Sequence, residues 1–369
     1  MQSKLKALTI FLLGAVLLVP LMSCEQKETA EAPDFECAFV NQEFSTYPGS
    51  GKKVRPARAT WNSGFILEAI YTRALEHMGY EVEKYKEVSG PIFYQSLVDG
   101  DLDFWANGWF PLHNKMLPDD FDQKAEKVGY IVKNGAVQGY LASKDLVEEY
   151  DIKSLADFKR EEVVEAFDVD NDGKAEMVGC PPGWGCHKII TYHMEEAYPE
   201  VAENIDVTTG SYSASMSSEV AKHKNGEPVF FYTWTPNWTV NKLKPGEDVL
   251  WIGVPEIKPT PEQEDLDNPQ EALVGNDIDG AVTDPINMGF AANDIRVVAN
   301  KEFLDNNPGA KKLFELMSVS FDDITTQNQK MFEGEDTQED VEKHATEWIK
   351  ANKDKWIEWQ KKAREAAGQ

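Results

Sequence analysis

Three tryptophans of this chain stand at turn tips or strand ends, where an aromatic ring can face a ligand. Trp184 lies between two glycines in GCPPGWGC (179–186), Trp109 precedes Phe-Pro in NGWFPLHN, and Trp234 precedes Thr-Pro in VFFYTWTPNW. The negative face of an aromatic ring attracts cations, and each contact contributes roughly 0.5–2 kcal/mol. Three such faces could surround a quaternary ammonium group, which donates no hydrogen bonds. The alternative for each ring is packing in the core.

Cys180 and Cys186 enclose the Trp184 loop, and so close a pair in an exported chain indicates a disulfide. A bridge across so short a loop contributes only about 2 kcal/mol through chain entropy, so local shape explains it better. The bridge would hold the indole toward a ligand at little entropic cost. The N–H groups of Gly185 and Cys186 could bind an anion, since CHKIITYHMEEA indicates a helix that begins there. A cation box beside such an anion site fits a zwitterion.

Two histidines near these motifs are candidates for chemistry. His113 follows Trp109 by four residues and could donate a hydrogen bond to a carboxylate, or it could be a surface-loop residue. His187 follows Cys186, and a Cys-His pair could act as a thiol nucleophile with its base. Adjacent side chains rarely point at each other, and Cys186 has a disulfide partner nearby. The residues therefore argue against a thiol enzyme.

The segment DVDNDGKAE (168–176) partly matches a calcium-binding loop. Asp168, Asp170 and Asp172 occupy positions 1, 3 and 5 of the EF-hand pattern, and Gly173 occupies position 6. Position 12 is Gly179, where the pattern requires a glutamate. A structural calcium site and a plain Asx-rich turn both remain open, and the prediction includes no metal ligand.

The length indicates two domains or one large one, and the charge argues against nucleic-acid binding. The chain has 369 residues, of which 41% are hydrophobic, and a net charge of -27. So negative a chain repels nucleic acids and anionic membrane surfaces.

The N-terminal segment is typical of an export signal. Lys4 and Lys6 precede the apolar run 7–22, which is too short for a confident membrane span and ends in Ser23-Cys24. We predict a lipoprotein signal at 1–23, with lipidation of Cys24 and a flexible tether over 24–50 that contains the unexplained Cys37. The alternative is an ordinary secretory signal that happens to contain a cysteine.

Strands and helices alternate along the rest of the chain, which predicts an α/β fold with parallel βαβ units. Strands are expected at 53–60, 81–88, 101–108, 137–143, 228–234 and 248–255, with helices at 63–80, 91–100 and 154–167. Each Trp-x-Pro places Trp109 or Trp234 just past the carboxyl end of a strand, where open α/β sheets bind ligands. Two such lobes would face each other across a cleft.

With these motifs assembled, the chain resembles the glycine betaine/proline betaine-binding proteins of osmoprotectant ABC importers. The matching segments are NGWFPLHN, NGAVQGYL, DNDGKAEMVGCPPGWGC and GEPVFFYTWTPNW, and with VVANKEF and the C-terminal helix they cover nearly all of 52–369. The resemblance implies a two-lobed periplasmic-binding-protein fold of class II, which closes by a hinge on its ligand. Lobe I is expected at 51–138 plus 286–369 and lobe II at 139–285, each a mostly parallel sheet flanked by helices.

The resemblance also assigns roles to individual residues. Its tryptophan box falls on Trp109, Trp184 and Trp234, its carboxylate contacts on His113 and the backbone of Gly185 and Cys186, and its disulfide on Cys180 and Cys186. The lipid-anchor motif, the tether and Trp61 in RATWNSG depart from the family pattern. Trp61 either adds a fourth ring to the box or packs in the core.

The expected function is capture of a betaine for an ABC permease and its ATPase in osmoprotection. The protein would be an exported monomer, held by its lipid on the periplasmic or extracellular face of a bacterial membrane, with no catalysis and no cofactor. A choline or carnitine carrier is the alternative of the same class. An exported thiol enzyme that uses Cys186 and a surface adhesin are the alternatives of other classes.

Overall fold

The computed structural model describes residues 44–368. The predicted signal, Cys24, Cys37 and residues 24–43 of the predicted tether lie outside the described residues. The described end of that tether packs on the fold, because the Arg364 guanidinium lies 4.0 Å from the Phe44 ring centroid and donates to the Thr46 carbonyl at 3.0 Å. Within 44–368, none of the helices combines the length and the apolar run that a bilayer crossing requires.

The first five-stranded sheet has the spatial order β4-β2-β5-β14-β6. Its strands are β2 (Pro56–Ala59), β4 (Lys86–Val88), β5 (Phe104–Phe110), β6 (Ala125–Ala136) and β14 (Asn293–Asn300). β2 is parallel to β4 and β5, whereas β14 is antiparallel to β5 and β6. The central strand β5 is buried along its whole length, so it forms the core of this sheet.

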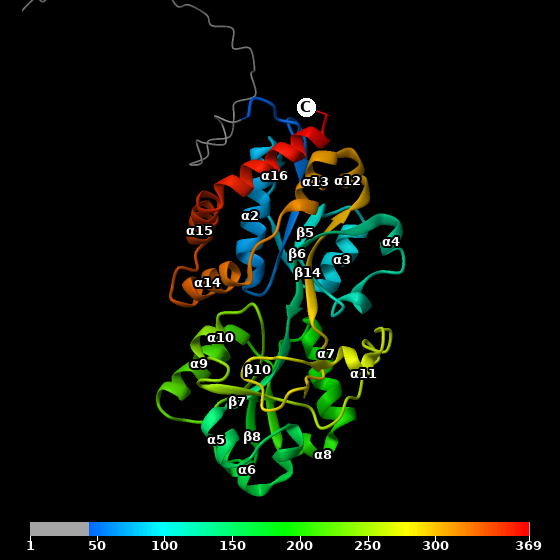
Figure 1. Ribbon diagram of the computed structural model, residues 1–369. Coiled ribbons are helices and arrows are strands. Elements are labelled where there is room, and N and C mark those ends of the chain that lie inside the picture. The colour runs from blue at the N-terminus through cyan, green and yellow to red at the C-terminus, as the bar shows by residue number, and fades with distance from the viewer. Residues whose placement is uncertain (1–43, 369) are drawn as a thin grey trace, which may run out of the picture. The chain divides into compact units, whose positions relative to one another are not determined.

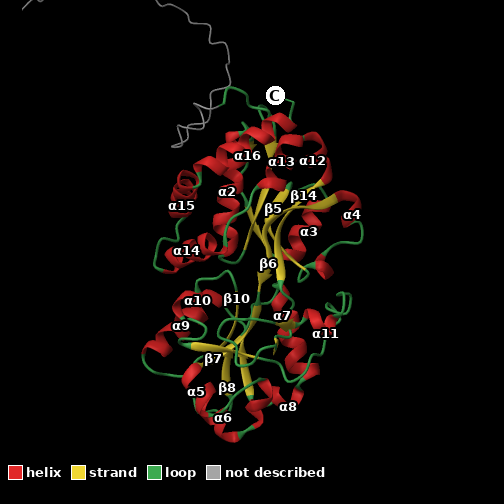
Figure 2. Ribbon diagram, in the orientation of Figure 1, coloured by secondary structure: helices red, strands yellow, loops and turns green. Residues whose placement is uncertain are grey.

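Helices cover both faces of the first sheet, and together they form what we call the first lobe (Figures 1 and 2). They are α2 (Ser63–His77), α3 (Gly90–Val98), α4 (Phe121–Lys124), α12 (Lys301–Asn306), α13 (Pro308–Leu316), α14 (Phe321–Phe332), α15 (Gln338–Ala351) and α16 (Lys353–Ala366). A short parallel pair, β1 (Lys53–Val54) with β3 (Glu81–Val82), and a 3-10 turn at Asn114–Met116 complete it. The helix predicted at 63–80 is confirmed as α2, which buries Ile66, Ile70 and Ala74, one on each successive turn.

The second five-stranded sheet has the order β11-β7-β10-β8-β9. Its strands are β7 (Gln138–Ser143), β8 (Ala175–Val178), β9 (Ile205–Thr208), β10 (Phe230–Trp234) and β11 (Val249–Ile252). β10 is parallel to β8, and β8 is parallel to β9, whereas β7 is antiparallel to both β10 and β11. Every residue of β7 and β10 is buried, so these two strands carry the core of this sheet.

The second lobe consists of this sheet and the helices around it. They are α5 (Lys144–Glu149), α6 (Glu161–Phe167), α7 (Gly185–Tyr192), α8 (Pro199–Ala202), α9 (Tyr212–Lys224), α10 (Thr239–Lys242) and α11 (Pro269–Ala272). The remaining elements are a 3-10 turn at Leu155–Lys159, a π-helical turn at His193–Ala197 and the antiparallel pair β12 (Val274–Gly275) and β13 (Ile286–Asn287).

The α/β fold in two lobes is confirmed, but the prediction of mostly parallel sheets is wrong in one detail. Each sheet has two parallel and two antiparallel pairings. In each sheet both antiparallel pairings belong to the one strand that enters from the other lobe. β7 follows β6 after a single residue and pairs antiparallel with β10 and β11, and β14 returns from the second lobe and pairs antiparallel with β5 and β6.

The lobes touch through a set of side chains that we call the clasp. It consists of Trp238, Asn241 and Lys242 at α10 of the second lobe and Gln329, Phe332 and Glu333 at α14 of the first. The Trp238 and Phe332 rings stack at a centroid distance of 4.0 Å. Lys242 Nζ lies 2.6 Å from a Glu333 carboxylate oxygen, and Asn241 Nδ2 donates to Gln329 Oε1 at 3.0 Å. The clasp therefore joins the lobes through contacts that involve none of the predicted binding residues.

Candidate functional site

A cavity lies between the two lobes. Its lining residues are Trp61, Trp109, Leu112 and His113 from the first lobe and Gln138, Trp184, Gly185, Cys186, Tyr232 and Trp234 from the second. All six residues that were predicted to bind a ligand line this one cavity. No aspartate, glutamate, lysine or arginine is among the lining residues, so the cavity is neutral and largely aromatic in a chain of net charge -27.

The aromatic walls come from two strands and one helix start. Trp109 is the penultimate residue of β5 and pairs with Ile295, and Trp234 is the last residue of β10 and pairs with Gln138. Both therefore lie within their strands, and the expectation that they follow the strand ends is corrected by one or two residues. The ladders continue through both tryptophans because the prolines that end them come two residues later. The Trp184 and Trp234 rings meet edge to face, with centroids 5.4 Å apart.

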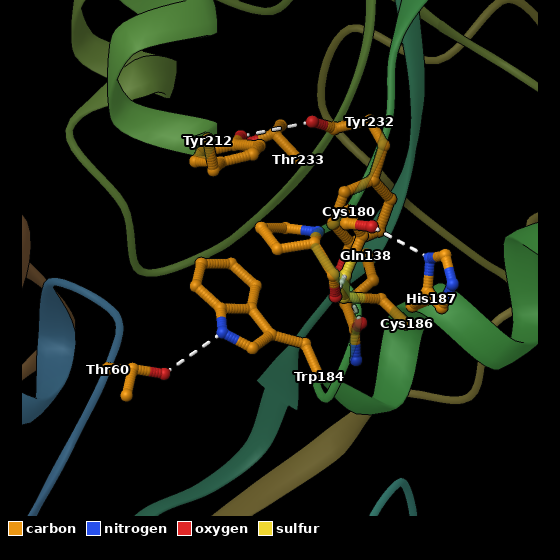
Figure 3. Close-up of a disulfide and its surroundings, with 10 residues drawn as sticks. Thr60, Gln138, Cys180, Trp184, Cys186, His187, Tyr212, Tyr232 and Thr233 are labelled. Carbon is orange, nitrogen blue, oxygen red and sulfur yellow. Dashed lines mark hydrogen bonds between the residues drawn. A yellow bond between two sulfur atoms is a disulfide. The ribbon is translucent and has the colours of Figure 1, made fainter. Parts of the chain in front are cut away.

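The predicted disulfide between Cys180 and Cys186 is present, and it closes the loop that carries Trp184. Figure 3 shows the indole projecting from this loop toward Thr60, to whose Oγ1 its Nε1 donates at 3.0 Å. Thr60 belongs to the first lobe, so the ring bridges the two lobes. The disulfide also leaves Cys186 without a thiol, which contradicts the thiol-enzyme alternative.

Helix α7 begins at the cavity, with Trp184 at its N-cap. The N–H groups of the first helical turn have no acceptor within the helix, and the first two belong to Gly185 and Cys186. A Cβ atom on Gly185 would lie 2.6 Å from the Leu112 side chain of the opposite lobe. Glycine is therefore required for the first lobe to approach the helix start this closely. Free N–H groups at a helix start, together with the helix dipole, could bind an anion at this end of the cavity.

His113 is buried and lines the same cavity. Its Nδ1 accepts from the Trp109 backbone N–H at 3.3 Å and lies 2.9 Å from the Tyr94 hydroxyl. Since a backbone N–H can only donate, Nδ1 carries no proton and the ring hydrogen is on Nε2. Burial, followed by the charge of Lys127, lowers the pKa of His113 to about 3. The ring is therefore neutral at pH 7 and offers one Nε2–H, which corrects the surface-loop alternative.

Because three histidines are buried, we expect the folded protein to lose stability in mild acid. Burial is the largest cause that lowers the pKa of His77, His113 and His193 to about 3. Between about pH 6.5 and 3 the unfolded chain binds protons at these rings that the folded chain does not, so stability falls as the pH falls. Burial of Glu68 raises its pKa to about 7 and acts in the opposite direction.

Burial also raises the pKa values of Glu76 and Glu219. These groups therefore make the folded chain more stable as the pH falls, which partly offsets the loss of stability due to the histidines. We expect the free energy of unfolding to be roughly 1–3 kcal/mol lower at about pH 5 than at about pH 7. Urea unfolding in about 0.5 M salt, which screens the net negative charge, measures this difference. A His77→Gln variant should show a smaller pH dependence. Equal or greater stability of the natural chain at the lower pH would contradict the prediction.

Sequence reasoning missed Gln138 and Tyr232, two polar residues that line the cavity. Gln138 Oε1 accepts from the Tyr232 hydroxyl at 2.6 Å, and Gln138 Nε2 is buried without a partner within 44–368. The Trp234 Nε1–H is likewise buried and unpartnered among those residues. Both groups are donors, and a buried donor without a partner costs about 1–3 kcal/mol, so they favour a ligand that brings acceptor oxygens. The signal for Gln138 was a single amide in the otherwise apolar strand VQGYLA.

The acidic loop at 168–176 lies apart from the cavity. Asp168 accepts from the backbone N–H groups of Asp172 and Gly173, and Glu176 accepts from those of Val169 and Asp170. These hydrogen bonds within the loop are those of an Asx-rich turn, which was one of the two alternatives from the sequence. Oxygens of Asp168, Asp170 and Glu176 lie within 4.8 Å of one another, so calcium binding stays an untested possibility.

Comparison with known proteins gives matches along most of the chain. The family model described as the substrate binding domain of ABC-type glycine betaine transport system matches residues 52–351. A glycine betaine/proline betaine-binding periplasmic protein of Escherichia coli (strain K12) is 37% identical over 331 residues, which cover 89% of this chain and 95% of that protein. The protein of the same description from Salmonella typhimurium is 37% identical over 317 residues and covers 86% and 91%.

Solved structures share the fold. Lactococcal OpuAC, in its closed-liganded conformation complexed with glycine betaine, has a TM-score of 0.59 at 17% identity and covers 84% of this chain and 99% of that chain. An ABC-transporter choline binding protein in complex with choline has a TM-score of 0.60 at 21% identity and covers 85% and 98%. At these identities the likeness establishes the two-lobed architecture and nothing more specific.

Proposed function

This chain belongs to the family of substrate-binding domains of ABC-type glycine betaine transport systems, and we propose that it captures glycine betaine or proline betaine outside the cytoplasm for delivery to an ABC permease. The curated relatives that match most of its length are described as binding both betaines. The chain's own role is to bind and release the ligand, while the permease and its ATPase move it across the membrane.

The observation that carries this proposal is a neutral aromatic cavity with hydrogen-bond donors at one end. Trp109, Trp184 and Trp234 would surround the quaternary ammonium head, and none of the lining side chains is a carboxylate that would also attract Na⁺ or lysine. The N–H groups of Gly185 and Cys186 and the Nε2–H of His113 would bind the carboxylate. A proline molecule would leave its ammonium N–H groups without acceptors among the indoles, which costs binding energy.

A choline or carnitine carrier remains the second candidate, because a choline binding protein shares the fold. Choline has the same cationic head but no carboxylate, so the donors at the start of α7 and on His113 would lack an anion. The cavity therefore favours a betaine over choline.

Anchoring and domain organisation are parts of the same proposal. We propose that the protein is a monomer on the periplasmic or extracellular face of a bacterial membrane, held by a lipid on Cys24 after removal of residues 1–23. We assign the lobes to 51–138 plus 286–369 and to 139–285 as predicted, except that Gln138 of β7 and Ile286–Asn287 of β13 go with the second lobe, so that the ligand lies where the two meet. Mass spectrometry of the membrane-extracted protein tests the lipid on Cys24.

Isothermal titration calorimetry tests the proposed ligand class. The purified protein is titrated in parallel with glycine betaine, proline betaine, choline and proline. We expect saturable one-to-one binding of the betaines, weaker binding of choline and little heat from proline. Heat from choline alone would favour the second candidate, and no heat from any of the four would favour the adhesin alternative.

Because the clasp joins the lobes, we expect a clasp residue outside the cavity to affect ligand affinity. Phe332→Ala removes the ring that stacks on Trp238 at 4.0 Å, and an aromatic pair contributes about 0.5–1.5 kcal/mol. Since the contact exists only when the lobes meet, its loss should depopulate the closed form and weaken glycine betaine binding by roughly 2- to 10-fold. Calorimetry of Phe332→Ala and Phe332→Tyr measures this effect.

Ile92→Ala is the matched control, because Ile92 is an exposed residue of α3. It should bind like the natural chain, and Phe332→Tyr should recover most of the lost affinity. Unchanged affinity in Phe332→Ala would show that the clasp does not contribute to closure.

A further inference from the structure

Trp61 lines the cavity together with the three predicted tryptophans. It follows β2 in the first lobe and is 6% exposed. Its ring lies 5.6 Å from that of Trp184, at an interplanar angle of 67°, so it meets the second lobe at the cavity. This contact distinguishes it from a ring that only packs inside its own lobe.

A single buried amide holds Trp61 and Trp109 together. Asn107 Oδ1 accepts from Trp61 Nε1 at 3.0 Å and from Trp109 Nε1 at 2.6 Å. Asn107 is 1% exposed, and its Nδ2 donates to Ser63 Oγ at 3.3 Å, so the amide is fixed in turn. Because each indole has one N–H, sharing one acceptor restricts the rotation of both rings.

The four indoles of the cavity are joined by an unbroken series of contacts. Asn107 connects Trp109 to Trp61, Trp61 contacts Trp184 at 5.6 Å, and Trp184 contacts Trp234 at 5.4 Å. Trp105 supports Trp61 from the core, with ring centroids 5.5 Å apart. A ring supported from behind and held by its N–H cannot move aside for a larger ligand without breaking these contacts.

We propose that Trp61, held by Asn107, is a specificity-determining residue that forms a fourth wall of the cation box and limits the size of the cationic head. The inference rests on the proposed function, because it concerns the same cavity. The four-walled box favours the compact trimethylammonium head of glycine betaine. The dimethylammonium of proline betaine belongs to a five-membered ring and needs more room on one side.

Calorimetry with glycine betaine and proline betaine on Trp61 variants tests this inference. Trp61→Ala should weaken glycine betaine binding by about 2- to 30-fold, the range for loss of one cation–π contact. Proline betaine should lose less, so the preference for glycine betaine should fall by at least about threefold. Trp61→Phe keeps a ring but loses the bond to Asn107, so its preference should lie between those of the natural chain and Trp61→Ala.

Phe93→Leu is the control for a purely structural effect. Phe93 is fully buried and packs on Trp105 at 4.4 Å, but it does not line the cavity. It should lower thermal stability and leave the ratio of the two affinities unchanged. An unchanged ratio in Trp61→Ala, with betaine binding intact in the natural chain, would overturn the role of Trp61 alone. Failure of the natural chain to bind either betaine would overturn the proposed function, and this inference with it.

Discussion

A Trp184→Ala variant is expected to bind glycine betaine about 30-fold more weakly than the natural chain. The change removes one wall of the cation box, which contributes roughly 0.5–2 kcal/mol. It also removes the Nε1 hydrogen bond to Thr60 across the lobes, which contributes about 0.5–1.5 kcal/mol when the lobes close. The sum of about 1–3.5 kcal/mol corresponds to roughly 5- to 300-fold in the dissociation constant, as calorimetry would measure it.

Two further variants separate these contributions. Thr60→Val removes only the acceptor for Trp184 Nε1 and should weaken binding by a few-fold. Trp184→Phe keeps an aromatic face but loses the N–H, so its affinity should lie between those of the natural chain and Trp184→Ala. If Trp184→Ala bound glycine betaine as tightly as the natural chain, the indole would be a packing residue and the cation box would be refuted.

Replacement of His113 by leucine is expected to weaken betaine binding much more than choline binding. A hydrogen bond to a charged group contributes about 1.5–3 kcal/mol, so loss of the Nε2–H should weaken glycine betaine binding roughly 10- to 150-fold. Choline has no carboxylate, and its affinity should change by no more than about threefold. His113→Gln can still donate a hydrogen bond and serves as the conservative control. Equal losses for both ligands would mean that His113 supports the cavity without binding the carboxylate.

The same histidine predicts how binding depends on pH. Because the pKa of His113 is lowered to about 3, the ring stays neutral throughout the range from about pH 5 to 8. Glycine betaine affinity should therefore be flat over that range. An affinity that rises as the pH falls through about 6.5 would show that the imidazolium form binds the carboxylate.

Local pattern was sufficient to predict much of the fold. Helix α2 followed from its apolar periodicity, β5 and β10 followed from their aromatic residues and the prolines behind them, and β7 was also predicted. The strand β6 was missed because its burial does not alternate, and its pairing with β14 shifts register three times along the strand. A strand that bends this often shows no period of two in its sequence.

Only part of the candidate site could be found from the sequence. Trp109, Trp184, Trp234 and His113 stand in turns or near strand ends and could be found from the sequence. The sequence left Trp61 as an open alternative and marked Gln138 only by one amide in an apolar strand. It gave no sign of Asn107 or Leu112, because their roles depend on contacts between strands or between lobes. Asn107, which binds both indoles, lies 46 positions from Trp61 and two positions from Trp109. No local spacing rule describes that arrangement.

A crystal structure with glycine betaine bound is the most direct test of the account. It should show the trimethylammonium group among the rings of Trp109, Trp184 and Trp234. The carboxylate oxygens should lie within hydrogen-bond distance of the Gly185 and Cys186 N–H groups and of His113 Nε2. A ligand bound outside this cavity, or one whose carboxylate faces the indoles, would contradict the account.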